Sequence, residues 1–183
     1  MEQGRNPRME NSDNNVVGTE SVKLANYLNS VRFDSGVMAR LRRGTTEDGR
    51  MGAERCLSRA GVVGWGESLR EHHLGCAMVV GVVFTIIKKH DSQLGNFGDS
   101  MAVFLSRNKN GRTGIDRVAG LLFQSERGMM EDRVIQCARR MRGYVGAINM
   151  ERLYRDIVYW NSDVGLRWFC SYERRVAQSR ERS

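Results

Sequence analysis

Proline is almost absent from this sequence, and cysteine is scarce. The 183 residues include one proline, Pro7, so nothing from Arg8 to Ser183 forces a proline break in a helix. Sandwiches and barrels usually need proline-rich turns between alternating strands, and the composition therefore favours an all-α fold. The 4 cysteines are too few and too scattered for a disulfide scaffold.

Long hydrophobic runs are also missing. The longest apolar stretch, residues 74–87, has 14 residues, whereas a helix that spans a bilayer needs about 20. We therefore expect a buried core helix here and no association with a membrane. The N-terminal sequence MEQGRNPRMENSDNN lacks the apolar segment of a signal peptide, and together with free cysteines this predicts a cytoplasmic protein.

The hydrophobic residues that are present, 40% of the chain, recur at helical spacing and suffice for a core. They predict an all-α protein of two small helical lobes. The expected parts are a disordered polar tail (1–18), an N-terminal lobe (19–95), a C-terminal lobe (96–178) and a basic tail (179–183). The helices with clear apolar periodicity are expected at 20–32, 37–43, 67–89, 115–125, 129–147, 150–160 and 163–178.

Motifs of known catalytic chemistry are absent. No GxSxG, GxxxxGK[ST] or GxGxxG pattern occurs. His72 and His73 with Cys56 and Cys76 form the only metal-like group, and they lack a CxxC or HExxH pair. We therefore predict no catalytic residue, no metal and no cofactor. A metal-dependent nuclease remains a weaker hypothesis, and its carboxylates would be Asp91, Asp99, Asp156 and Asp163.

Aromatic residues gather near the C-terminus at spacings typical of packing between two helices. Such residues either form a core or stack on nucleobases, and we favour the core here. The group comprises Tyr154, Tyr159, Trp160, Trp168, Phe169 and Tyr172.

Charge is strongly biased toward arginine. The net charge is +8, and because lysine occurs at only 4 positions, arginine supplies 25 of the 29 basic residues. Arginine presents a planar fork that matches phosphate, and phosphate polymers are the commonest target of excess positive charge. A solvated basic surface without a nucleic-acid role is the alternative interpretation.

The excess charge is concentrated in residues 100–155, which hold 11 basic and 5 acidic residues. On a wheel of the predicted helix 129–147, Val134, Cys137, Ala138, Met141, Val145 and Ile148 share one side. The arginines of this segment flank or oppose that apolar stripe, and a basic loop at 107–114 precedes it. The candidate phosphate-binding residues from charge alone are Arg42, Arg43, Arg112, Arg133, Arg139, Arg140 and Arg142.

Six blocks of the sequence, in order, resemble CasB, the small subunit of the type I-E CRISPR Cascade complex. The resemblance covers about 21–173. Three glycines, Gly128, Gly143 and Gly146, depart from it by interrupting a helix that the family builds from better helix formers. The blocks are Asp34-Ser35-Gly36 to Leu41-Arg42-Arg43, Gly64-Trp65 with the apolar helix 74–84, Gly98 to Leu105, Ile115-Asp116-Arg117 to Leu122, Ala138-Arg139-Arg140-Met141, and Met150 to Tyr172.

The resemblance implies an all-α subunit without a catalytic centre. Two copies would lie along the Cascade complex against its RNA-bearing backbone subunits and its large subunit. The basic face would hold the duplex of CRISPR RNA and target DNA and the displaced strand, stabilising the R-loop in antiviral defence. Arg43, Arg117 and Arg140 match family positions implicated in nucleic-acid contact, and Arg42 and Arg139 are their neighbours.

Two other classes of protein remain open. An independent helical DNA-binding regulator would need a helix-turn-helix whose second helix reads base edges. A purely structural interaction protein would pack its arginine faces on acidic partners.

Overall fold

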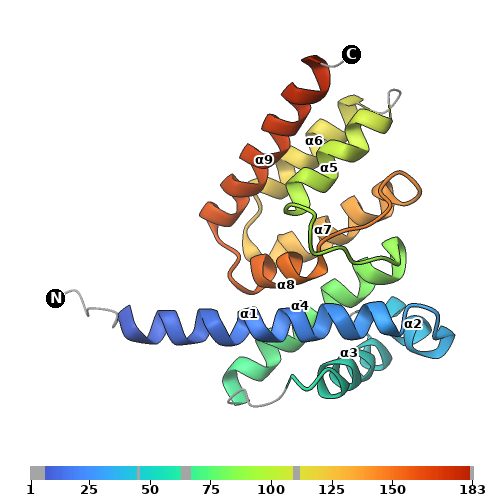
Figure 1. Cartoon of the computed structure of the whole chain (residues 1–183), viewed down its shortest axis with the longest axis vertical. Helices are drawn as coiled ribbons and strands as arrows, with labels where there is room; N and C mark the ends of the chain where they lie inside the picture. The colour runs from blue at the N-terminus through green and yellow to red at the C-terminus, as the bar shows by residue number, and fades with distance from the viewer. Residues whose placement is uncertain (1–6, 45, 63–66, 109–111, 182–183) are drawn as a thin grey trace.

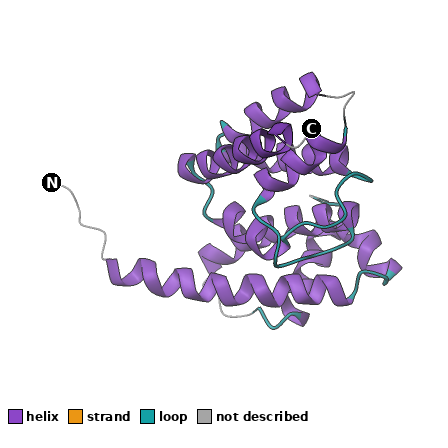
Figure 2. Cartoon of the chain, turned by 45° about the horizontal axis from the view of Figure 1, so that its top comes forward, coloured by secondary structure: helices purple, strands orange, loops and turns teal. Residues whose placement is uncertain are grey.

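A computed structural model shows an all-α chain, as predicted (Figures 1 and 2). It describes residues 7–44, 46–62, 67–108 and 112–181, and the side chains of these ranges except those of 7–16, 67–68 and 112–115. No strand occurs in these ranges, where an isolated bridge joins His90 to Ile148. The helices there are α1 (Pro7–Ser30), α2 (Ser35–Arg42), α3 (Glu47–Arg59), α4 (Glu67–Ile87), α5 (Phe97–Arg107), α6 (Arg112–Phe123), α7 (Arg127–Met141), α8 (Met150–Val158) and α9 (Ser162–Glu181).

Helix α1 is much longer than the sequence predicts. Its predicted start at Glu20 is wrong, and residues 7–18, assigned to a disordered tail, are helical. Proline is well tolerated in the first turn of a helix, so Pro7 fits the observed start. Buried Val17, Leu24 and Leu28 fix α1 from its middle onward, and its N-terminal part extends away from the other helices (Figure 2).

Helix α7 is shorter than predicted. It ends at Met141 rather than at residue 147, because Arg142 is extended and Gly143 adopts a φ of 83°, a value that glycine tolerates best. Val145 and Ile148 are buried, but they lie in the loop after α7 and not on its apolar stripe. At the other end of the chain, α9 continues to Glu181 and so includes part of the predicted basic tail.

Helix α4 passes through the centre of the protein. Its Val80, Val83 and Phe84 are fully buried, as expected for the apolar stretch. By length and composition the segment Leu69–Ile87 is apolar enough to cross a membrane. Most of this segment is buried inside the protein, as in a core helix.

The helices form two groups with α7 and α8 between them. Figure 1 shows α1, α2, α3 and α4 below and α5, α6 and α9 above. Helix α4 packs on both α7 and α8, and α1 packs on α8. One apolar cluster continues through both groups. The division into two lobes stays a prediction.

Helix α9 lies unusually close to α5 and α6 through two glycines. A Cβ at Gly98 would overlap the Trp168 carbonyl, and one at Gly165 would overlap the Phe123 carbonyl. The hydroxyl of Tyr172 donates to Asp116. Because Phe123 pairs with Gly165 and Asp116 with Tyr172, α6 and α9 run antiparallel, and this arrangement places the residues at the end of α6.

Candidate nucleic-acid interface

Three predicted arginines lie together at the end of α7. Arg139 and Arg140 occupy its last turn and Arg142 follows it, and all three are exposed. Among the described residues, none of the three guanidinium groups makes a hydrogen bond or an ion pair. Cations at a helix C-terminus are favoured by the helix dipole, so these arginines are favourably placed without acidic partners. We call Arg139, Arg140 and Arg142 the α7-end cluster.

The loop after this cluster is fixed by two further contacts. Arg107 of α5 donates through Nη1 to the Tyr144 carbonyl at 2.7 Å, and the Ile148 amide donates to the Lys89 carbonyl at 3.1 Å. The first contact brings a fourth guanidinium within two residues of Arg142. Arg107 belongs to the predicted basic loop but was not among the candidate residues, because its role depends on the position of a loop 37 residues later.

A groove between α5 and α9 continues this basic surface. One hollow of about 320 Å³ adjoins a second of about 450 Å³, and both are lined by Val103, Arg107 and Arg175. Lys89 and Asp91 also line the first hollow. Its other carboxylate, Asp99, lies 3.8 Å from Arg174, which balances its charge. The groove therefore carries a positive excess.

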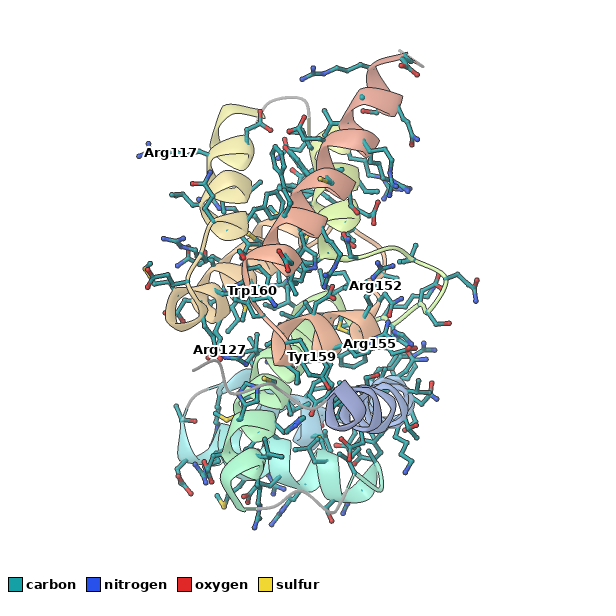
Figure 3. The ribbon with its side chains drawn as sticks, turned by 90° about the vertical axis from the view of Figure 1, so that its left-hand side faces the viewer. Arg117, Arg127, Arg152, Arg155, Tyr159 and Trp160 are labelled. Carbon is teal, nitrogen blue, oxygen red and sulfur yellow. The ribbon has the colours of Figure 1, made fainter. Side chains whose placement is uncertain are left out.

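Arg117 lies on the outer side of α6, away from the α7-end cluster. Figure 3 shows it projecting from α6 at the left edge of the view. Its side chain is exposed and has no hydrogen bond or ion pair with any described residue. Arg112 is the first residue of α6, and its side chain lies outside the described part of the structure.

The two arginines at the end of α2 differ from each other. Arg43 forms an ion pair with Asp48 in the first turn of α3, and its side chain is 56% exposed. Arg42 is exposed and has no partner among the described residues. The candidate arginines thus come from three places in the fold, at the ends of α2 and α7 and on the side of α6.

Arg133 does not have the outward orientation that the helical wheel predicts. Its Nη1 donates to the Leu121 carbonyl and to Ser125 Oγ, the latter at 2.6 Å. It therefore satisfies a carbonyl in the last turn of α6 and fixes the turn between α6 and α7. These contacts engage Nη1 within the fold, and the phosphate-binding role of Arg133 stays a prediction.

The metal-like group of the sequence is organised around an arginine that sequence analysis missed. Arg127 donates to His72 Nε2 at 2.7 Å, and its Nη2 lies 3.8 Å from Cys76 Sγ. Burial raises the pKa of the Cys76 thiol to about 12, so it stays protonated. A cation among these side chains opposes metal binding, and no group of three metal-ligating side chains occurs among the described residues.

Four of the six C-terminal aromatics are buried, which confirms the predicted core for Tyr154, Trp160, Trp168 and Tyr172. The prediction is wrong for the other two, since Phe169 is 42% and Tyr159 is 37% exposed.

Asp156, one of the carboxylates considered for a nuclease, is largely enclosed and accepts a hydrogen bond of 2.6 Å from Trp168 Nε1. Burial raises its pKa. The Asp156 carboxylate holds the Trp168 ring in the core. In the described residues it does not join other acids in a group that could bind a metal.

The comparisons with known proteins give similarity at the level of structure. No family model matches the sequence, and no curated protein matches it. A solved chain of a CRISPR RNA-guided surveillance complex has a TM-score of 0.69 and 14% identity, covering 91% of this chain and 99% of its own. CasB from Thermus thermophilus has a TM-score of 0.62 and 17% identity, covering 84% of this chain and 97% of its own. The chain therefore has the fold of CasB.

Proposed function

We propose that this protein belongs to the CasB family and acts as the non-catalytic small subunit of a CRISPR surveillance complex of the Cascade type. The observation that carries the proposal is the match of nearly the whole of two such chains to this fold. The six sequence blocks support it independently, because they occur in the same order along the chain. The role belongs in the cytoplasm, with CRISPR RNA, target DNA, the backbone and large subunits and a second copy as partners.

In this role the protein binds sugar–phosphate backbones through arginines that the fold leaves uncommitted. Arg42, Arg117 and the α7-end cluster have this property among the described side chains, whereas Arg43 and Arg133 are engaged within the fold. Exchanging a DNA duplex for a guide–target duplex is nearly neutral in energy, so contacts to the backbone can stabilise the R-loop. Such contacts need charge and shape and no reading of bases.

An independent DNA-binding regulator is less well supported. The short turn between α2 and α3 gives the nearest approach to a helix-turn-helix, and α3 would then be the recognition helix. Its first turn carries Glu47 and Asp48. Glu47 would repel phosphates at the end that enters the major groove, where Asp48 is paired with Arg43.

The test uses the assembled surveillance complex and a matched target DNA. Alanine at Arg117, Arg139, Arg140 and Arg142 removes four uncommitted charges and should weaken target binding at least 10-fold while the subunit still folds and assembles. The control removes four ion-paired arginines, Arg50, Arg70, Arg167 and Arg174, and so makes the same change in net charge. Equal losses in the two variants, or no loss in the first, would contradict the proposed role of the uncommitted arginines.

A further inference from the structure

A pocket of about 610 Å³ lies where the end of α6, the start of α7 and the α8–α9 turn meet. Figure 3 labels Trp160 and Arg127 in this region. Its volume is in the range of pockets that bind small organic groups. The apolar walls come from four side chains, Phe123, Trp160, Leu166 and Phe169.

The walls combine rigid and exposed surfaces. Trp160 is fixed because its Nε1 donates to the Ser125 carbonyl at 2.9 Å. Phe169 packs edge-on against Phe123, with ring centroids 6.0 Å apart, yet it remains 42% exposed. Leu166 on the same helix is 58% exposed. Exposed apolar surface around a hollow marks a binding site more often than an accident of folding.

The rim supplies polar groups of several kinds. The Asn161 side chain accepts from the Val164 amide at 3.0 Å through Oδ1, which leaves its amide nitrogen for another partner. Gln124 is an exposed second amide. Glu126 begins α7 without a side-chain capping bond. Amides and a carboxylate are the groups that hydrogen-bond to the edges of nucleobases.

Arg117 lies in line with this pocket along α6. It is seven residues from Gln124, so the two point to nearly the same side, and it is three residues, or about 4.5 Å of helix rise, from Gly120 in the lining. A phosphate bound to Arg117 would thus lie beside the pocket.

We propose that this pocket holds one unpaired nucleobase of a single strand, stacked on Phe169, with the adjoining phosphate on Arg117. The inference rests on the proposed function, which supplies an unpaired strand. An aromatic wall, polar groups at the rim and a neighbouring cation are the features that single-strand-binding proteins combine. A side chain of another protein would use the apolar walls but leave Arg117 without a role.

The structure offers a variant that fills the pocket without disturbing the fold. A Cβ at Gly120 would meet nothing within 4 Å, and leucine is a far better helix former than glycine. Gly120→Leu therefore places a side chain in the pocket of a protein that still folds. Gly18→Leu in α1 is the matched control, because the space at Gly18 is also open and lies on a different element.

The experiment measures binding of the full-length chain at low salt to two single-stranded oligonucleotides of equal length. One carries 2-aminopurine among natural bases and the other is abasic throughout. The wild-type protein and Gly18→Leu should prefer the strand with bases about 10-fold and change the 2-aminopurine fluorescence. Gly120→Leu and Phe169→Ala should lose both the preference and the fluorescence change, whereas Phe33→Ala, at an 85% exposed phenylalanine on the α1–α2 turn, should keep them.

The outcomes separate this inference from the proposed function. Equal binding of both strands by wild type and Gly120→Leu would overturn the base pocket and leave backbone binding intact. No binding of either strand by wild type would also overturn the pocket, while the complex-based test still decides the proposed function. Loss of subunit association in Gly120→Leu, with unchanged strand preference, would show that a protein side chain occupies the pocket.

Discussion

Arg127 of α7 donates a hydrogen bond to His72 of α4, with 2.7 Å between Nη2 and Nε2. A guanidinium has only donors, and His72 Nε2 also lies 3.0 Å from the Val158 carbonyl oxygen. The same guanidinium donates to the carbonyls of Ile157 and Val158 at 3.1 Å, at the end of α8. One side chain therefore ties three helices together where the two helix groups meet.

We expect Arg127→Ala to destabilise the protein by about 2–4 kcal/mol, because it leaves two carbonyls at the end of α8 and the half-buried His72 imidazole without this donor. Urea denaturation measures the change. Arg139→Ala is the control, since Arg139 is exposed and makes no contact of this kind among the described residues, and it should change stability by less than about 0.5 kcal/mol. A similar small effect for Arg127→Ala would show that the three helices do not depend on this contact.

Stability should fall on acidification because of His73. Burial, with His72 and Arg127 nearby, lowers the pKa of His73 to about 4, while the unfolded chain titrates near 6.5. Between these values the unfolded state binds more protons, so stability decreases as pH falls from about 6.5 to 4, by up to about 1.4 kcal/mol per pH unit.

The measurement compares urea midpoints of wild type and His73→Gln across this pH range. Glutamine does not titrate and keeps a polar group facing the Tyr154 hydroxyl, which lies 3.0 Å from His73 Nδ1. The variant should therefore lose less stability than wild type on acidification. Parallel pH profiles would contradict the low pKa of His73.

Two glycine-to-alanine substitutions should have opposite effects. At Gly98 the new methyl would overlap the Trp168 carbonyl, so α5 and α9 must separate and the loss should be about 2 kcal/mol or more. At Gly120 the space is open, and alanine should stabilise α6 by up to about 1 kcal/mol. Thermal denaturation of both variants checks this. A neutral or stabilising Gly98→Ala would contradict the close approach of α5 and α9, and a destabilising Gly120→Ala would contradict the open space at Gly120.

The salt dependence of nucleic-acid binding should report the α7-end cluster. Each phosphate contact adds about 0.9 to the slope of log K against log salt on duplex DNA. Alanine at Arg139, Arg140 and Arg142 should lower the magnitude of the slope by about 2 to 3 in the assembled complex. The ion-paired variant Arg50→Ala with Arg70→Ala serves as control and should leave the slope nearly unchanged. An unchanged slope in the triple variant would mean that the cluster does not contact phosphate.

The sequence predicted helices best where apolar periodicity and end signals agree. Helix α8 shows this, since Asn149 caps its start and Leu153 and Ile157 form a buried stripe. It failed at the first half of α1, where no such signal exists, and at the end of α7, where the apolar residues after Gly143 extended the predicted helix past that glycine. The polar first half of α1 has no apolar periodicity, and the end of α7 depends on the positive φ of Gly143.

What the sequence alone determined is the class of the protein: helical, rich in arginine, and similar in six ordered blocks to CasB. The helical class and the arginine excess follow from periodicity and charge, which are local properties, and the likeness to CasB rests on the six blocks. Only the tertiary structure decided which arginines remain available for a ligand. Arg43 meets Asp48 and Arg133 meets the end of α6, while Arg139 meets no acid among the described residues. Such pairings depend on helices brought together by burial of the core, which no pattern along one helix can show.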